Sequence, residues 1–404
     1  MPRTATRSEA AFAAAAFLGR LDALFAGLAR PVPLHEPLFG KEEEEAVRRA
    51  VASGWVSSAG PEIARFEERL AALTGARHAV AVVNGTAALH LAFRAVGVRP
   101  GDEVIMPPLT FVATANAAVH AGAVPHFVDI EPARLGLDPA ALARRLEAVA
   151  ERRPDGVFNR WTGRRIAAVA LVHVFGVPAC DAEVAEVCRE WGLPLVEDAA
   201  EALGSRRAGR HAGLTGACGA LSFNGNKIVT TGGGGAVITD DEALAGRVRH
   251  WATVARRPHA FRFFHDETAF NYRLPNLNAA LGLAQLARLD AFLAAKKALH
   301  DRYREALAGL PGVRLREAPA DAAPNHWLIA AEIDVPDTAA RDAVIARAAA
   351  AGIGLRPVWD LLHRLPMYRD APRGDLATAE ALEPRLVCLP SGPAVALAIA
   401  RRRM

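Results

Sequence analysis

The 404-residue chain contains little cysteine and no cysteine pair with the spacing of a zinc or redox motif. Four cysteines in a chain of this length do not indicate a disulfide framework. We therefore expect buried free thiols, a reducing compartment and a cytoplasmic protein. The 13 histidines include no HExxH motif, so the sequence predicts no metal site.

The chain also has no concentration of charge of one sign. Its 48 basic and 44 acidic residues leave a net charge of +4, and the densest basic cluster is Arg401–Arg403 at the C-terminus. A mildly basic surface suits anionic substrates, but without a basic helix we expect no nucleic-acid partner. The apolar stretch 10–19 is too short to cross a bilayer, so no membrane partner is expected.

The first 32 residues predict an amphipathic helical extension that packs on the main body. Most of their large apolar side chains fall on one helical face, interrupted by Arg20 and Asp22: Phe12, Phe17, Leu21, Leu24, Phe25 and Leu28. The alternative is a transit peptide, because the segment is rich in alanine and arginine and poor in acidic residues. No convincing cleavage site follows the apolar stretch, which favours the packed helix.

From about residue 60, helical stretches alternate with short apolar runs, which is typical of βαβ units and a mainly parallel sheet. The predicted strands are 79–83, 103–106, 124–128, 167–172, 193–196, 220–223 and 236–239. The predicted helices are 61–73, 86–96, 181–191 and one beginning near residue 113. This pattern predicts an α/β fold with a large domain over residues 33–270.

The pattern changes near Asn271–Asn278. One long helix is predicted over Leu277–Leu307, followed by a strand at His326–Ile333, a helix at Arg341–Ala351 and a strand near Ile353–Arg356. Residues 271–404 are therefore predicted to form an interdomain helix and a smaller α+β domain.

Chemistry-bearing residues follow several of the strands, at the edge where open α/β sheets bind ligands. Asn84-Gly85-Thr86 begins a predicted helix, whose N–H groups and Thr86 hydroxyl could hold a phosphate. Taken alone, this segment is more often a plain turn with a threonine N-cap. Phe111 follows the strand 103–106 and could stack on a planar cofactor, although core packing is the commoner role of such a residue.

Two further segments carry charge. The strand 193–196 leads into Glu197-Asp198-Ala199-Ala200-Glu201, where a carboxylate could pair with a cationic ring nitrogen; the alternative is an exposed acidic loop. Lys227 follows Ser222–Asn226 and precedes a glycine run, a setting that suits a Schiff-base lysine. The alternative is a surface lysine beside a flexible hairpin. The order of phosphate loop, aromatic residue, carboxylate and lysine is more informative than any single member.

These segments, together with Asn271–Ala280, resemble the DegT/DnrJ/EryC1/StrS sugar aminotransferases, and the resemblance extends from about Pro33 to Ser391. It implies the α/β fold-type-I architecture of pyridoxal 5'-phosphate (PLP) enzymes, which is aspartate-aminotransferase-like. The large domain then has a mainly parallel mixed sheet, and the C-terminal domain is smaller and α+β. It also implies a homodimer with shared active sites.

The resemblance implies a role for each matching residue. Lys227 forms the Schiff base and moves protons, and Asp198 keeps the ring nitrogen protonated. Phe111 stacks on the ring. The phosphate contacts are Gly85, Thr86, Ser222 and, from the partner subunit, Asn271. Glu201 departs from the family pattern, which has glutamine or histidine near the cofactor's phenolic oxygen, so it must be protonated or find another partner.

A closer resemblance, to aminotransferases of the legionaminic acid and bacillosamine routes, is carried by Pro33–Pro37, Gly54–Ser58, Arg356–Trp359 and Leu365–Tyr368. It implies L-glutamate as donor and a nucleotide-linked 4-keto-6-deoxy-N-acetylhexosamine, UDP-linked or in some pathways GDP-linked, as acceptor. The substrate-binding candidates are Arg273, Arg356, His326 and His363, each with an alternative structural role. Two other functions remain open: amination of another keto sugar nucleotide, of the GDP-perosamine or 3-keto type, and a non-catalytic PLP-binding regulator.

Overall fold

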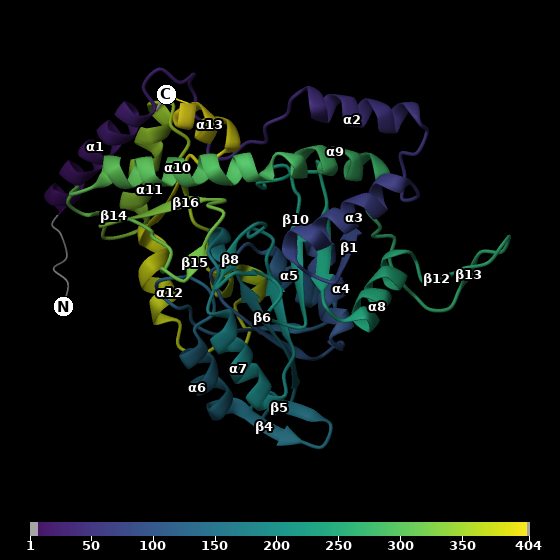
Figure 1. The fold of residues 1–404 in the computed structure, drawn as a ribbon. Helices are drawn as coiled ribbons and strands as arrows, with labels where there is room; N and C mark the ends of the chain where they lie inside the picture. The colour runs from purple at the N-terminus through teal and green to yellow at the C-terminus, as the bar shows by residue number, and fades with distance from the viewer. Residues whose placement is uncertain (1–6, 402–404) are drawn as a thin grey trace.

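The structure is a computed structural model that describes residues 7–401, with side chains described from Ala14 onward (Figure 1). Residues 1–6 of the predicted extension, the side chain of Phe12, and Arg402 and Arg403 of the basic cluster lie outside the described part.

The central sheet has the strand order β1-β11-β10-β7-β6-β2-β3. Its strands are β1 (His78–Val82), β2 (Glu103–Met106), β3 (Val124–Phe127), β6 (Arg165–Val172), β7 (Leu195–Asp198), β10 (Cys218–Ser222) and β11 (Gly235–Thr239). The five strands from β10 to β3 are parallel, whereas β11 runs antiparallel to both of its neighbours. The predicted mainly parallel mixed sheet is confirmed.

Helices cover both faces of this sheet because side chains alternate along each strand. On β2, Val104 and Met106 pack in one apolar cluster, and Ile105 packs in another on the opposite face. The first cluster includes side chains of α4 (Gly85–Ala95), α5 (Ala113–His120) and α8 (Glu242–Ala252), and the second those of α6 (Pro139–Val149) and α7 (Asp181–Trp191). Helix α4 is buried in the first cluster from Ala87 onward, and its first turn begins shortly after β1.

A second sheet, antiparallel throughout, has the order β14-β16-β18-β17. Its strands are β14 (Val313–Leu315), β16 (Ile329–Ile333), β18 (Leu386–Leu389) and β17 (Arg356–Pro357), and its helices are α11 (Thr338–Ala350) and α13 (Pro393–Arg401). Helix α1 (Arg7–Leu24) joins this part of the chain, because Phe17, Leu21 and Phe25 are fully buried in the same apolar cluster. None of the described helices is long and apolar enough to cross a membrane.

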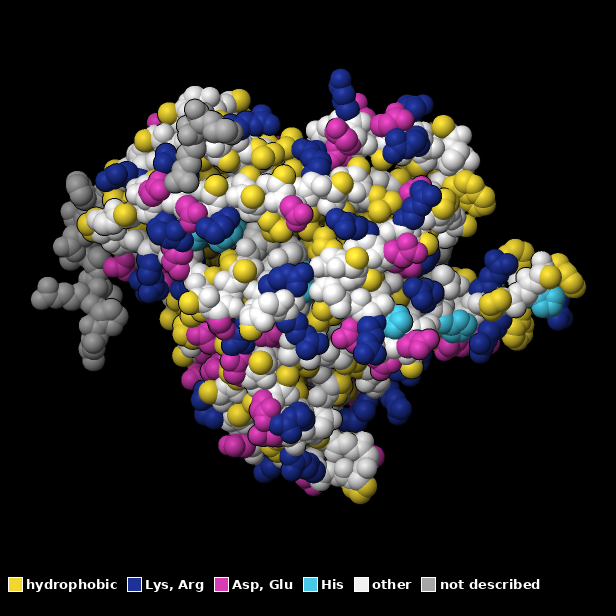
Figure 2. All heavy atoms as spheres, in the orientation of Figure 1, with side chains coloured by type: hydrophobic (Ala, Val, Ile, Leu, Met, Phe, Trp, Pro, Cys, Tyr) yellow, Lys and Arg dark blue, Asp and Glu magenta, His cyan; other side chains and the backbone are white. Residues whose placement is uncertain are grey.

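The remaining α-helices and strands include β4 (Ala150–Arg153) and β5 (Gly156–Asn159), which extend the central sheet beside β6. Others are α2 (Lys41–Ala52), α3 (Pro61–Thr74), α12 (Ala377–Leu382), β8 (Arg206–Arg207), β9 (Arg210–His211), β15 (Ala322–Ala323), β12 (Arg256–Arg257) and β13 (Phe264–His265). The hairpin β12–β13 projects away from the body of the molecule (Figures 1 and 2).

The predicted uninterrupted helix Leu277–Leu307 is wrong. The structure has α9 (Asn276–Ala287) and α10 (Leu289–Leu307), which lie end to end and are separated at Arg288, where ψ is −3° (Figure 1). The side chains of Gln285 and Arg288 both donate to the carbonyl of Leu38, at 3.0 and 3.1 Å. The break lets α9 pack on α2 and α3 while α10 packs on α1 and α13.

Three local predictions also differ from the structure. Asn84, not Thr86, is the N-cap of α4, since its side chain accepts the N–H of Ala87 at 2.8 Å. The predicted strand from His326 begins only at Ile329, because His326 has a φ of 52° that takes it out of the extended region. The strand predicted near Ile353–Arg356 is replaced by a single parallel bridge between Ile353 and Val32 and by the two-residue strand Arg356–Pro357.

Candidate active site

Lys227 lies in the loop that follows β10, with its side chain only 12% exposed. Its Nζ atom is 3.6 Å from Oε1 of Glu201 and 3.8 Å from the ring centroid of Trp327. Burial lowers the pKa of Lys227 below its ordinary value, and the carboxylates of Glu201 and Asp198 oppose that shift. The alternative of an exposed surface lysine is wrong, and a lowered pKa favours the nucleophilic amine.

Asp198 is the last residue of β7, and it is buried rather than part of an exposed acidic loop. Its Oδ2 accepts the hydroxyl hydrogen of Thr114 at 2.7 Å, and its Oδ1 accepts the N–H of Ala200 at 3.1 Å. Burial raises the pKa of Asp198, against the lowering effect of these hydrogen bonds. Within the described part of the chain no cation forms an ion pair with this carboxylate, so a protonated ring nitrogen is the partner that it can accommodate.

Glu201 lies three residues after Asp198 and is also buried. Its Oε2 accepts the N–H of Phe175 at 2.8 Å, and its Oε1 faces the amine of Lys227. Burial raises the pKa of Glu201 to about 7, although Lys227 lowers it. The carboxyl group can therefore hold or release a proton near neutral pH beside the lysine, which a glutamine could not do.

The phosphate candidates gather at the N-terminus of α4. A Cβ atom on Gly85 would lie 2.9 Å from Cβ of Ser222, so only glycine permits this approach of α4 to β10. Thr86 is half-buried in the first turn of the helix. The unpaired N–H groups of that turn, with two nearby hydroxyl groups, form a suitable cradle for a phosphate.

Phe111 and Asn271 are both displayed at the surface of the chain. Phe111 is 53% exposed, so it does not pack in the core and its ring is open to another planar group. Asn271 is exposed at the base of the hairpin β12–β13 and pairs with Thr253. Tyr272, the next residue, lies beside the strand that leads to the phosphate candidates. Its carbonyl accepts the N–H of Val83, two residues before Gly85, at 2.9 Å.

Three of the substrate candidates are engaged by other protein groups. Arg273 forms an ion pair with Glu67 through both terminal nitrogens. His326 stacks on His300, with ring centroids 4.4 Å apart, and burial lowers its pKa to about 3. The Nε2 atom of His363 lies 3.1 Å from Oε1 of Glu380.

Arg356 differs from these three candidates. It is exposed on β17, and no hydrogen bond or ion pair of its side chain is found within residues 7–401. Among the four substrate candidates, it is the one whose guanidinium group is open to an anion.

Two residues of the site were missed by sequence reasoning, Thr114 and Trp327. Thr114 lies one helical turn beyond the predicted Phe111, and nothing in its sequence context marks it as a partner of Asp198. Trp327 follows the predicted His326 in the chain. The sequence feature that could have marked it is a large aromatic residue within the expected strand 326–333. The backbone of His326 is left-handed, with a φ of 52°. This helps to turn the side chain of Trp327, and not that of His326, toward Lys227.

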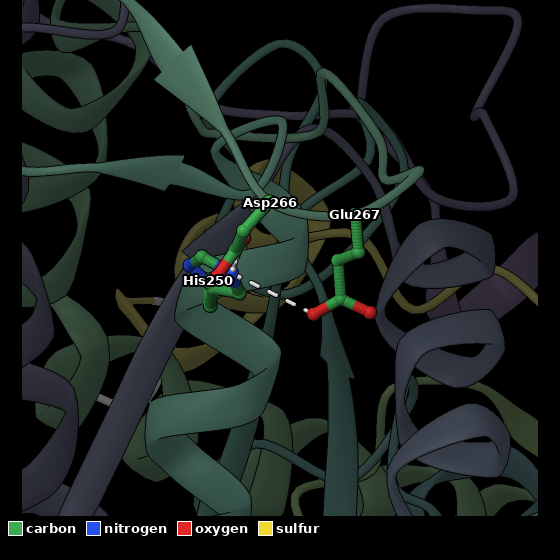
Figure 3. A group of neighbouring side chains, drawn as sticks. All are labelled: His250, Asp266 and Glu267. Carbon is green, nitrogen blue, oxygen red and sulfur yellow. Dashed lines mark hydrogen bonds and ion pairs between the residues drawn. The ribbon is translucent and has the colours of Figure 1, made fainter.

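Figure 3 shows a group of three side chains at the base of the hairpin that could hold a metal ion: His250, Asp266 and Glu267. The Nε2 atom of His250 lies 2.7 Å from Oδ1 of Asp266 and 3.6 Å from Oε1 of Glu267. The other oxygen of Asp266 already accepts a hydrogen bond from Arg257. We assign these contacts to anchoring the hairpin on α8.

Together, the buried lysine, the buried carboxylate on the neighbouring strand and the glycine-lined helix N-terminus define a PLP-dependent aminotransferase of the fold-type-I class. Each part fits the cofactor: Lys227 its aldehyde, Asp198 its ring nitrogen, and Gly85 with Ser222 its phosphate.

Comparison with known proteins gives the family. The model of the DegT/DnrJ/EryC1/StrS aminotransferase family matches residues 37–402, and the chain belongs to this family of PLP-dependent enzymes. It is 37% identical to EpsN of Bacillus subtilis (strain 168), over 90% of this chain and 91% of the relative. It is 38% identical to the GDP-perosamine synthase of Caulobacter vibrioides, over 85% of this chain and 89% of the relative. The crystal structure of DesI in the presence of its TDP-sugar product superposes with a TM-score of 0.80 and 34% identity, covering 94% of each chain.

Proposed function

We propose that the enzyme transfers the amino group of L-glutamate to a nucleotide-linked 4-keto-6-deoxy-N-acetylhexosamine, with UDP as the nucleotide. The products are the 4-amino sugar nucleotide and 2-oxoglutarate. The observation that carries the proposal is the amine of Lys227, which is buried within reach of Glu201 and follows the strand that neighbours the one ending at Asp198.

The side chains divide the work of this reaction. The bound cofactor supplies an electron sink for the carbon that loses its proton. Lys227 would take the proton from that carbon and deliver it to the cofactor carbon on the other side of the shared nitrogen, a role that typically contributes about 10²–10⁴-fold in rate. Asp198 keeps the ring nitrogen protonated, and Glu201 holds a proton near the phenolic oxygen or exchanges it with Lys227.

The remaining candidates bind and orient the reactants. Phe111 covers the ring, and Gly85, Thr86 and Ser222 hold the phosphate with Asn271 of the partner subunit. Arg356 is proposed to bind the nucleotide diphosphate or the carboxylate of glutamate, because its guanidinium group is exposed and open. Arg273, His326 and His363 remain substrate candidates only if their present partners release them.

The choice of substrate rests on similarity. The segments 33–37, 54–58 and 356–359 favour an N-acetylhexosamine acceptor. A second candidate is the GDP-linked precursor of perosamine, which is favoured by the likeness to GDP-perosamine synthases of Caulobacter vibrioides and Vibrio cholerae, at 38% and 35% identity. A 3-keto sugar nucleotide is the third.

We also propose a cytoplasmic homodimer with shared active sites, in which residues 33–270 form the cofactor-binding domain of each subunit. Support comes from the hairpin β12–β13, which carries Phe261, Phe263 and Phe264 with exposed fractions of 82%, 75% and 60% (Figure 2). Three exposed aromatic side chains on one projecting arm are typical of an interface. Asn271 lies where this arm returns to the body.

The test supplies the PLP-loaded enzyme with L-glutamate and UDP-, GDP- or dTDP-linked 4-keto sugars, and follows each nucleotide sugar by mass spectrometry. The proposal expects amination of the UDP-linked N-acetylhexosamine above the others. Preferred amination of the GDP-linked ketone would assign the second candidate. A spectral response to glutamate without any amino sugar would favour a regulatory protein.

A further inference from the structure

Trp327 contacts Lys227 in two ways, although the two residues are a hundred positions apart in the chain. The face of its indole ring lies under the amine, with Nζ 3.8 Å from the ring centroid. Its indole N–H donates to the carbonyl of Asn226 at 2.7 Å. One side chain therefore holds both the free end of the lysine and the peptide from which the lysine extends.

Trp327 is itself fixed in place and only 4% exposed. The backbone N–H of Trp327 donates to Oδ1 of Asn325 at 2.8 Å, and its backbone carbonyl accepts a hydrogen bond from the hydroxyl of Ser391 at 3.0 Å. The amide nitrogen of Asn325 donates to the carbonyl of Glu201 at 2.8 Å. The indole and the carboxyl group that flank the Lys227 amine thus belong to one hydrogen-bonded unit.

A second buried lysine, Lys296, contacts the backbone of Trp327. Nζ of Lys296 contacts the carbonyls of Trp327 and Ser391 and lies 3.1 Å from Nε2 of His35. Burial lowers its pKa well below the ordinary value. Its amine is therefore engaged by backbone carbonyls and His35, and it does not contact the indole ring that faces Lys227.

The catalytic cycle requires a second position for the amine of Lys227. A lysine that bonds to the cofactor in one state must be stored, still within reach, in every state where the cofactor holds the amino group. The face of the Trp327 indole and Oε1 of Glu201 both contact the amine of Lys227 and can hold it in those states.

We propose that Trp327 is a positioning residue for Lys227: its indole face receives the amine whenever the lysine is not bonded to the cofactor, and its N–H fixes the Asn226 peptide. The proposal rests on the assignment of Lys227 as the cofactor lysine. Binding of pyridoxal phosphate draws the amine away from the indole, whereas binding of pyridoxamine phosphate leaves it there.

The test compares the dissociation constants of the cofactor-free full-length protein for pyridoxal phosphate and for pyridoxamine phosphate. Trp327→Leu removes the contact that stabilises the free amine. The ratio of the two constants, pyridoxal over pyridoxamine, should therefore fall by about two- to thirtyfold, the range of a cation–π contact. Trp327→Phe keeps a ring face and should lower the ratio less, and it serves if the leucine variant folds poorly.

Two controls separate positioning from structure. Trp251→Leu removes another tryptophan that contacts cations, Arg94 and Arg247, and should leave the ratio unchanged. In a Lys227→Ala background, Trp327→Leu should no longer move the ratio. A loss of affinity that is equal for both cofactor forms would overturn the proposal, as would an effect that persists without Lys227. If the unchanged protein fails to bond pyridoxal phosphate at all, the proposed function fails instead.

Discussion

Replacing Glu201 by glutamine should change how the stability of the cofactor-free protein depends on pH. The carboxyl group is 5% exposed, and burial raises its pKa from the ordinary 4.5 to about 7. Because the folded pKa lies above the unfolded one, the contribution of this group to stability is fully present below pH 4.5 and is lost as pH rises through 7. A shift of about 2.5 pH units corresponds to about 3 kcal/mol.

Glutamine keeps the shape of the side chain but cannot ionise. The Glu201→Gln protein should therefore gain about 3 kcal/mol in free energy of unfolding, relative to the unchanged protein, between pH 5 and pH 8. In a Lys227→Met background the gain should be larger, since Lys227 lowers the pKa of Glu201.

The assay is urea unfolding followed by circular dichroism at several pH values. Glu68→Gln, on the exposed side of α3, is the matched control and should show no such gain. A difference between Glu201→Gln and the unchanged protein that stays constant from pH 5 to pH 8 would refute the reasoning.

Three other substitutions test the site and its supports. Thr114→Val removes a hydrogen bond to the buried carboxylate of Asp198, so cofactor affinity measured by equilibrium dialysis should weaken by about 1.5–3 kcal/mol; unchanged affinity would contradict the assigned role. Arg273→Met leaves Glu67 buried without its closest partner and should cost about 3–5 kcal/mol in urea unfolding, whereas a raised KM at full stability would restore Arg273 as a substrate ligand. Among the described residues, His90 finds no hydrogen-bond partner for either ring nitrogen, and burial lowers its pKa from 6.5 to about 4. The contribution of His90 to stability should therefore fall by about 3 kcal/mol between pH 6.5 and pH 4, so in urea unfolding the His90→Phe protein should lose less stability over this range than the unchanged protein; an equal loss would contradict the buried neutral histidine.

The sequence predicted the parts of the site that follow from strand ends. Lys227, Asp198 and Glu201 each come shortly after a buried apolar run, and parallel strands bring such positions to one edge of a sheet. That rule needs no knowledge of side-chain packing, so the sheet and the gathering of the lysine and the carboxylates at one edge were predictable, whereas the contact between Lys227 and Glu201 was not.

The contacts that failed to be predicted depend on single backbone angles and distant partners. At His326 a φ of 52° interrupts the expected strand just before Trp327, which faces Lys227. At Arg288 a change in one turn ends a helix whose amino-acid pattern continues without a break. Arg273 is an open cation in the sequence, and only the fold brings Glu67 to it. The periodicity of apolar residues carries no information on contacts between side chains that are far apart in the sequence.

The most direct test of the account is the conversion of a ketone to an amine on a sugar nucleotide. The PLP-loaded enzyme is given L-glutamate and UDP-linked 4-keto-6-deoxy-N-acetylglucosamine, and the sugar nucleotide is followed by mass spectrometry beside the Lys227→Ala variant. The account predicts an amino sugar nucleotide that requires glutamate and is absent with the variant. It is contradicted if no keto sugar nucleotide is aminated and glutamate leaves the absorbance of the bound cofactor unchanged, or if Lys227→Ala retains substantial turnover.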